Sequence, residues 1–231
     1  MLLGEKSLAV LKNSHVAVFG IGGVGSFICE ALARAGVGKL TLIDHDAVSV
    51  SNINRQLVAL HSTVGKYKTE IMAARIRDIN PDCAVYEMRE FYEEENASHF
   101  FSRQYDFIAD AIDSVPSKVH LICEAKSRSI PIISSMGTGN RLDPTQFVIT
   151  DLSKTSGCPL ARVMRQKLRQ KGITHHTVLS STELPLTPIQ DPELRQSVPG
   201  SVSWTPPCAG MMIAGHIIRS LLDNSANSCK E

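Results

Sequence analysis

The segment that most restricts the fold is HVAVFGIGGVG, residues 15–25. An apolar run leads into Gly20, Gly22 and Gly25, spaced as GxGxxG, and a helical pattern follows; this is typical of a strand, a tight turn and a helix. Glycines in such a turn can adopt positive φ and let backbone N–H groups approach a phosphate at the helix N-terminus. Asp44 ends the next apolar run, where its carboxylate can accept hydrogen bonds from a ribose. The pattern indicates a nucleotide without identifying it, and a tight turn that binds no ligand is the alternative.

Segments with strand and helix patterns alternate as far as about residue 135, which predicts a doubly wound, Rossmann-like α/β fold with a mostly parallel sheet. We expect strands at 15–20, 39–44, 84–90, 105–113 and 130–135, and helices at 23–36, 65–80, 93–103 and 117–129. Beyond these lie expected antiparallel C-terminal strands in 141–151 and 174–180, a helix at 158–172, a helix at 208–222 and a frayed end. Six of the eleven prolines lie between Pro185 and Pro207, so we expect a mobile crossover loop there.

The length of 231 residues fits one α/β domain, with a nucleotide-binding core at 14–135 and a substrate-binding part and extension at 136–231. No apolar run is long enough for a transmembrane helix, and the N-terminal residues lack the pattern of a secretory signal. We therefore expect a cytoplasmic protein. The six cysteines form no CxxC pair, which indicates reduced, mostly buried thiols and argues against a zinc site built from paired cysteines.

A dense polar cluster follows Asp44 at the expected end of the second strand. It consists of Asp46, Asn52, Asn54, Arg55 and Gln56, followed by Lys66 and Lys68. A nucleoside triphosphate carries several negative charges that arginine and lysine neutralise, whereas a dehydrogenase has no need of these cations beside its cofactor. A solvated polar loop is the alternative interpretation.

The segment DAIDS, residues 110–114, supplies two carboxylates where another strand leaves the core, at the edge where open α/β sheets bind ligands. A carboxylate there can hold Mg²⁺ against a triphosphate. We favour Asp113 over Asp110 as the metal ligand, because a helix is expected to start directly after it. A helix N-cap is the other role open to one of the two.

A basic helix is expected at 158–172, a stretch without acidic residues. Its five cations are Arg162, Arg165, Lys167, Arg169 and Lys171. Apolar residues Leu160, Val163, Met164 and Leu168 recur at three- and four-residue steps, so we expect them to pack inward while the cations face outward. Such a face can bind the phosphates of RNA, although a solvated basic face is equally ordinary. Lys118, Lys126 and Arg128 are candidates to extend this patch.

Taken together, GIGGVGS, LIDHDAVSVSNINRQ, VGKYKTE, INP and DAIDS resemble, over about residues 14–135, the adenylating enzymes related to ubiquitin-activating enzyme: the ThiF, MoeB and HesA group. This resemblance implies activation of a carboxylate by ATP and Mg²⁺, with release of pyrophosphate. It implies that Asp44 binds ribose, that Asn52, Arg55 and Lys68 contact the phosphates, and that Asp113 holds the metal. The expected cofactor-binding residues are Gly20, Gly22, Gly23, Gly25, Asp44, Asp46, Asn52, Arg55, Gln56 and Lys68, with Ser26 also near the phosphates.

Residues 137–172, with the marks DPT, DLSKT and PLA before the basic helix, are similar to the subgroup that dehydrates threonylcarbamoyladenosine in tRNA, TcdA (CsdL). That resemblance implies a tRNA substrate, a homodimer and a partner from a sulfur or cysteine-desulfurase system. Two departures stand out. Members often have an arginine before the N-terminal helix that reaches the partner's nucleotide, and this chain begins MLLGE; its C-terminal helix also lacks an extra apolar segment.

Two other functions remain open from the sequence. One is activation of the C-terminus of a ubiquitin-like sulfur-carrier protein, which needs a thiol; Cys208 and Cys158 are expected at helix starts, where a thiol pKa is lowered. The absence of CxxC pairs and the basic helix weigh against it. The other is an NAD-binding oxidoreductase or a nucleotide sensor, against which Arg55 and Lys68 weigh. His175 and His176 are expected to be strand residues rather than ligands.

Overall fold

The computed structural model describes residues 2–187 and 200–228. Its strands are β1 (His15–Phe19), β2 (Lys39–Ile43), β3 (Ala84–Met88), β4 (Phe107–Asp110), β5 (Ile132–Ser135), β6 (Phe147–Asp151) and β7 (Thr177–Ser181). Its helices are α1 (Gly4–Asn13), α2 (Gly25–Arg34), α3 (Lys68–Ile79), α4 (Ala97–Phe100), α5 (Val115–Ser127), α6 (Pro159–Gln170) and α7 (Thr205–Ser228). Short 3₁₀ turns lie at Val50–Asn52, His61–Thr63, Pro144–Gln146 and Leu152–Lys154.

The seven strands form one sheet in the order β3-β2-β1-β4-β5-β7-β6. All neighbouring strands are parallel except β6 and β7, which pair antiparallel. The chain therefore winds outward from β1 in one direction and restarts at β4 in the other. This is the doubly wound, mostly parallel sheet with antiparallel C-terminal strands that the sequence predicts, and the prediction is confirmed.

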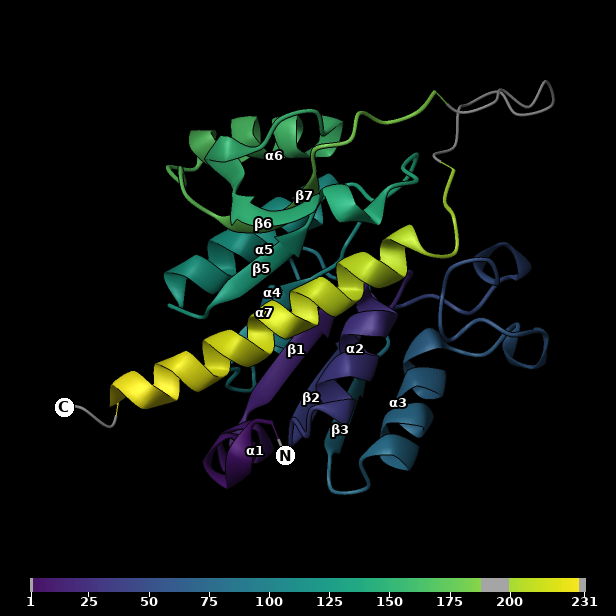
Figure 1. Cartoon of the computed structure of the whole chain (residues 1–231), viewed down its shortest axis with the longest axis vertical. Coiled ribbons are helices and arrows are strands. Elements are labelled where there is room, and N and C mark those ends of the chain that lie inside the picture. Colours follow the sequence, from purple (N-terminus) through teal and green to yellow (C-terminus); the bar gives the residue numbers. More distant parts are fainter. Residues whose placement is uncertain (1, 188–199, 229–231) are drawn as a thin grey trace.

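Both faces of the sheet are covered, which explains why its strands read as nearly continuous apolar runs. On one face, Val16 and Val18 of β1 belong to a core that includes residues of α1, α2, α3 and α7. On the other, Ala17 and Phe19 pack with residues of α4, α5 and α6. Figure 1 shows α7 running diagonally beside α2, while α6 lies at the top of the view with β6 and β7.

Several element bounds differ from the sequence-based expectation. The last helix starts at Thr205 and continues to Ser228, so the expected fraying is wrong for residues 223–228. Once a helix is formed, each further residue adds a hydrogen bond without a new nucleation step, so a polar segment can extend it. His175 and His176 precede β7 instead of lying in it. The sequence predicts a mobile loop between Pro185 and Pro207. Residues 188–199 of that segment lie outside the described residues.

Candidate nucleotide-binding site

The glycine turn between β1 and α2 is built by close backbone contacts. Gly20 has a φ of +88°, and a Cβ atom placed there would lie 2.7 Å from the carbonyl oxygen of Ala111. A Cβ at Gly25 would collide with the carbonyl oxygen of Gly20. Glycine is therefore needed at position 25 because of close packing, and not because of a positive φ angle. Ser26 is fully buried; its hydroxyl donates to the carbonyl of Gly22 (2.6 Å) and accepts from the N–H of Leu57. The Ser26 hydroxyl therefore supports the turn and does not line the cavity, and its expected place near the phosphates stays a prediction.

A cavity of about 450 Å³ opens at the carboxyl ends of β1, β2 and β4, where the winding direction of the sheet reverses. Ligands of open α/β sheets bind at this position. The residues predicted from the sequence that line it are Gly20, Gly22, Gly23, Asp44, Asp46, Asn52, Arg55, Gln56, Lys68 and Asp113. Of the predicted cofactor-binding set only Gly25 does not line the cavity, because it supports the turn from behind.

Lys68 and two aspartates form a charged cluster on one wall. The Lys68 ammonium lies 2.6 Å from Asp46 Oδ2 and 3.8 Å from Asp44 Oδ1. Asp44 also ties two strand ends together, because its carboxylate accepts the N–H of Ile21 at 2.7 Å and the N–H of Asp46 at 2.8 Å. The Lys68 side chain is 7% exposed and that of Asp46 50% exposed, so a ligand in the cavity can replace Asp46 as the partner of the ammonium.

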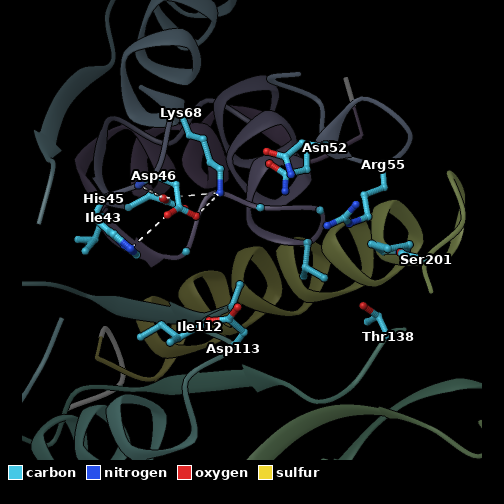
Figure 2. A pocket seen from close by; sticks show the side chains of 18 of the residues that line it. Ile43, His45, Asp46, Asn52, Arg55, Lys68, Ile112, Asp113, Thr138 and Ser201 are labelled. Carbon is cyan, nitrogen blue, oxygen red and sulfur yellow. Dashed lines mark hydrogen bonds and ion pairs between the residues drawn. The ribbon is translucent and has the colours of Figure 1, made fainter. Parts of the chain in front are cut away.

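Arg55 lies along the same wall (Figure 2). One of its terminal nitrogens donates to the carbonyl of Ser51 (2.9 Å) and to Asn54 Oδ1 (3.0 Å), which holds the guanidinium in place. Asn54 in turn donates to the carbonyl of Ser201 at 2.9 Å, so the segment before α7 is joined to this wall. Gln56 is buried, and its Oε1 accepts no hydrogen bond from the described residues.

Asp113 faces this wall from across the cavity (Figure 2). Its side chain is exposed and makes no hydrogen bond or ion pair with residues 2–187 or 200–228. A free carboxylate oxygen is the hard donor that Mg²⁺ prefers, so Asp113 fits a metal ligand beside a triphosphate. Asp110, the other candidate, is fully buried and paired with Lys118 at 2.8 Å. Within the described ranges, the only three acid or histidine side chains close enough together for a metal are Asp44, His45 and Asp46, and Lys68 already pairs with both aspartates.

An apolar end of the cavity was missed from the sequence. It is lined by Ile43, Phe91, Tyr92 and Ile112, with His45 meeting the Phe91 ring edge-on at 4.9 Å between centroids. Tyr92 bonds His120 at 2.9 Å, and burial raises the pKa of its hydroxyl, so it stays neutral. A cavity that combines apolar and aromatic side chains with the cations Arg55 and Lys68 suits a nucleotide, which combines a base with charged phosphates. Phe91, Tyr92 and Ile112 follow strand ends, which is the signal that the sequence offered for them, whereas Ile43 lies in β2 itself.

The basic helix forms as expected, but its cations are not equivalent. Arg162, Lys167, Arg169 and Lys171 are exposed. Arg165 instead donates to the carbonyl and the hydroxyl of Thr155, at 3.0 and 2.9 Å. A shallow hollow of about 450 Å³ is lined by Arg162, Arg165, Gln166, Arg169 and Gln170. Val163 is 40% exposed, so the expectation that it packs inward is wrong.

The expected extension of this patch is wrong for Lys118 and stays a prediction for Lys126 and Arg128. Lys118 is fully buried and ion-paired, so it is not a surface cation. Arg128 bonds Glu124 and lies over the ring of Phe101 at 4.6 Å. Lys126 and Arg128 are both exposed.

The candidate thiols differ in accessibility. Cys158 is 4% exposed and directly precedes α6, whereas Cys208 is half-buried in the first turn of α7. Neither lines the cavity, although Pro206, two residues before Cys208, does.

The fold and the cavity define a nucleotide-binding α/β protein in which two cations, Arg55 and Lys68, face the carboxylate of Asp113, which is unpaired among the described residues. The chain belongs to the ThiF family, whose model matches residues 1–231. It is 45% identical to the tRNA threonylcarbamoyladenosine dehydratase of Bacillus subtilis over 96% of this chain and 92% of that protein. The dehydratase of the same name from Haemophilus influenzae is 50% identical over 71% of this chain and 63% of that protein.

Solved structures agree with these matches. The crystal structure of the E. coli tRNA N6-threonylcarbamoyladenosine dehydratase, TcdA, in complex with AMP has a TM-score of 0.91 at 38% identity. The match covers 98% of this chain and 93% of that chain. The same E. coli protein in complex with ATP has a TM-score of 0.89. Among the described residues, no helix combines the length and apolarity needed to cross a membrane.

Proposed function

We propose that this chain is an ATP-dependent tRNA threonylcarbamoyladenosine dehydratase. The observation that carries the proposal is the cavity at the reversal point of the sheet, where Arg55 and Lys68 face the free carboxylate of Asp113. Identity of 45% over nearly the whole length to a protein of that name supports the same activity. An oxidoreductase that binds NAD has no use for this pair of cations.

The chemistry divides into two steps. A carboxylate oxygen of the threonylcarbamoyl group attacks the α-phosphorus of ATP, and pyrophosphate leaves. A ureido nitrogen then attacks the acyl carbon, loses its proton and closes a five-membered ring as AMP leaves. Ring closure is intramolecular, and well-oriented reactions of this kind have effective molarities of roughly 10⁵ M or more, so no nucleophile from the protein is required.

The side chains of the cavity therefore position groups and neutralise charge. Arg55 and Lys68 would contact the phosphates, Asn52 and Gln56 would add neutral hydrogen bonds, and Asp44 would bind the ribose. Asp44 has one remaining acceptor position on each oxygen, since backbone N–H groups take the others. Asp113 would hold Mg²⁺, which supplies positive charge next to the phosphates when bound.

The exposed cations of α6 would bind the phosphate backbone of the tRNA. Arg162 and Arg169 line one hollow, two turns apart on the same helix, and Lys167 and Lys171 are exposed nearby in sequence. Cations on such a face give binding that weakens with salt. We further propose a cytoplasmic homodimer; a cysteine-desulfurase partner and a covalent role for Cys208 are separate predictions.

The test is to incubate the protein with ATP, Mg²⁺ and tRNA that carries the threonylcarbamoyl group. AMP release and the loss of one water from the modified nucleoside are the expected results. Asp113→Ala should slow both by about 100-fold or more, because charge on the phosphates is no longer neutralised. Asp82→Ala, an exposed aspartate paired with Lys12, is the matched control. Absence of AMP with this tRNA, and its appearance with a sulfur-carrier protein, would contradict the proposal.

A further inference from the structure

A buried ion pair lies directly beneath the segment that presents Asp113 to the cavity. Lys118, in the first turn of α5, and Asp110, at the end of β4, both have fully buried side chains, and their charged atoms are 2.8 Å apart. Neither residue lines the cavity. The chemistry proposed above gives them no task, although they are the only ion pair in the described ranges with both side chains fully enclosed.

Both polar backbone groups of Ile112 are bound to this pair. The Lys118 ammonium donates to the carbonyl oxygen of Ile112 at 3.0 Å, and the N–H of Ile112 donates to Asp110 Oδ1 at 3.1 Å. Ile112 lines the cavity, and Asp113 is the next residue. The pair therefore holds the backbone at the position from which the Asp113 carboxylate projects.

The same segment is fixed from the opposite side by the glycine turn. The N–H of Ala111 donates to the carbonyl of Phe19 at 2.8 Å. The missing side chain of Gly20 lets the carbonyl of Ala111 approach closely. Residues 111–113 are thus held between the phosphate-binding turn and the buried pair, with little freedom to shift relative to the cavity.

Stability alone gives a weak reason for such a pair. Taking two charges out of water costs about as much as their attraction returns, and an apolar pair of the same volume is often as stable or more so. One oxygen of Asp110, Oδ2, is buried and accepts no hydrogen bond from the described residues, which adds to that cost. What an apolar pair cannot supply is the set of directed hydrogen bonds to both backbone groups of Ile112.

We propose that Lys118, acting with Asp110, is a positioning residue that fixes residues 111–113 so that the Asp113 carboxylate faces the nucleotide. This inference rests on the proposed function, since it concerns the orientation of the residue assigned there to Mg²⁺. Lys118 itself touches neither nucleotide nor substrate.

The test uses the full-length double variant Asp110→Asn/Lys118→Met, because it removes both charges together and leaves neither one buried and unpaired. The asparagine can still accept from Ile112, whereas the methionine has no donor for the Ile112 carbonyl. Thermal unfolding reports whether the variant folds. ATP affinity is measured by calorimetry with Mg²⁺ and with EDTA, and the ratio of the two values is the gain in affinity that the metal gives. The kcat and KM are measured alongside.

We expect a folded variant with unchanged ATP affinity in EDTA. The Mg²⁺-dependent gain in affinity and kcat should both fall by about 10- to 100-fold, the usual effect of losing a group that orients a metal ligand. A folded variant with the wild-type Mg²⁺ gain and kcat would overturn the inference. Should the methionine prevent folding, Asp110→Asn/Lys118→Gln, whose shorter amide falls short of the Ile112 carbonyl, is measured instead with the same two outcomes.

Two comparisons separate this inference from the proposed function. Lys12→Met/Asp82→Asn removes an exposed lysine–aspartate pair of 3.2 Å and should change neither affinity nor kcat. Asp113→Ala should abolish the Mg²⁺ gain. If Asp113→Ala abolishes the gain and the buried-pair variant keeps it, only the positioning role of Lys118 fails. If Asp113→Ala keeps the gain, the metal assignment of the proposed function fails, and the positioning role fails with it.

Discussion

Two lysine–aspartate pairs flank the same cavity and differ in what surrounds them. Lys68 pairs with Asp46, whose side chain is half exposed, whereas Lys118 and Asp110 are wholly enclosed. A cation with a solvated partner can exchange that partner for a phosphate; an enclosed cation cannot, and can only hold the structure around it. The same contrast separates His175, which is exposed, from His176, which is buried. It also separates the exposed Arg162 and Arg169 from Arg165, which is bonded to Thr155.

The largest expected effect concerns the two lysines. Lys118→Met should lower the free energy of unfolding by about 3–5 kcal/mol, because it leaves the Asp110 carboxylate buried and unpaired. Lys68→Met should lower it by about 1 kcal/mol or less, because the Asp46 side chain remains in contact with water. Urea denaturation of both variants measures the difference. Equal losses of stability would remove the distinction between the two pairs.

The two histidines sharpen the contrast through pH. Burial lowers the pKa of His176 from 6.5 to about 3, with Lys126 and Lys118 lowering it further and Asp151 opposing them. Between pH 6.5 and about pH 3, the His176 side chain binds a proton in the unfolded chain but not in the folded chain. The free energy of unfolding therefore falls as the pH drops below 6.5. Each pH unit below 6.5 lowers the free energy of unfolding by about 1.4 kcal/mol. His176 should therefore account for a loss of about 2 kcal/mol of stability by pH 5.

Denaturation at several pH values between 6.5 and 5 tests this prediction. His176→Gln can keep a hydrogen bond to Ser134, which His176 contacts at 2.7 Å, and should give a shallower dependence on pH. His15 and His216, whose pKa values burial also lowers, leave a residual slope. The control is His175→Gln, since the His175 side chain is 80% exposed. An unchanged slope in His176→Gln would show that His176 is accessible to protons in the folded state.

The smallest expected effects concern the arginines of α6. Arg162→Glu and Arg169→Glu should each weaken tRNA binding and reduce the slope of log affinity against log salt by about 1, with thermal stability unchanged. Arg165→Ala should instead lower stability by about 1 kcal/mol, because Thr155 loses its donor. Binding titrations at several salt concentrations and thermal melts separate the two. Arg219→Glu, an exposed arginine on α7, is the control; an equal loss of tRNA affinity in it would argue against a specific face.

The succession of strands and helices along the chain and the polar wall of the cavity could be predicted because their signals are local. Apolar runs, a glycine turn and polar residues directly after strand ends suffice, since parallel strands bring their carboxyl ends to one edge. Its position shortly before α5, with only Ser114 between them, favours Asp113 over Asp110, and the burial of Asp110 agrees with that choice. The roles of these residues stay predictions until they are tested.

The apolar end of the cavity and the burial of Lys118 could not be predicted, because they depend on contacts between segments far apart in the sequence or in different elements. Ile43, Phe91 and Ile112 look like core residues in the sequence, since apolar residues that pack and apolar residues that line a cavity have the same pattern. The sequence alone places Lys118 on the surface, because a lysine on a helix is usually exposed. Its burial follows from the way the first turn of α5 folds back over the end of β4, which residue spacing does not reveal.

The position of α7 has a consequence for how the chain is made. Its residues Ile213, Ile217 and Leu221 belong to the same core as Val16 and Val18 of the first strand. During synthesis, the part of this core that α7 covers therefore stays open until residues 205–221 have left the ribosome, even after α1, α2 and α3 have formed. Nascent chains that stop before Thr205 would present the core surface beneath Ile213, Ile217 and Leu221 to chaperones and proteases, so synthesis of α7 is itself a condition for a closed core.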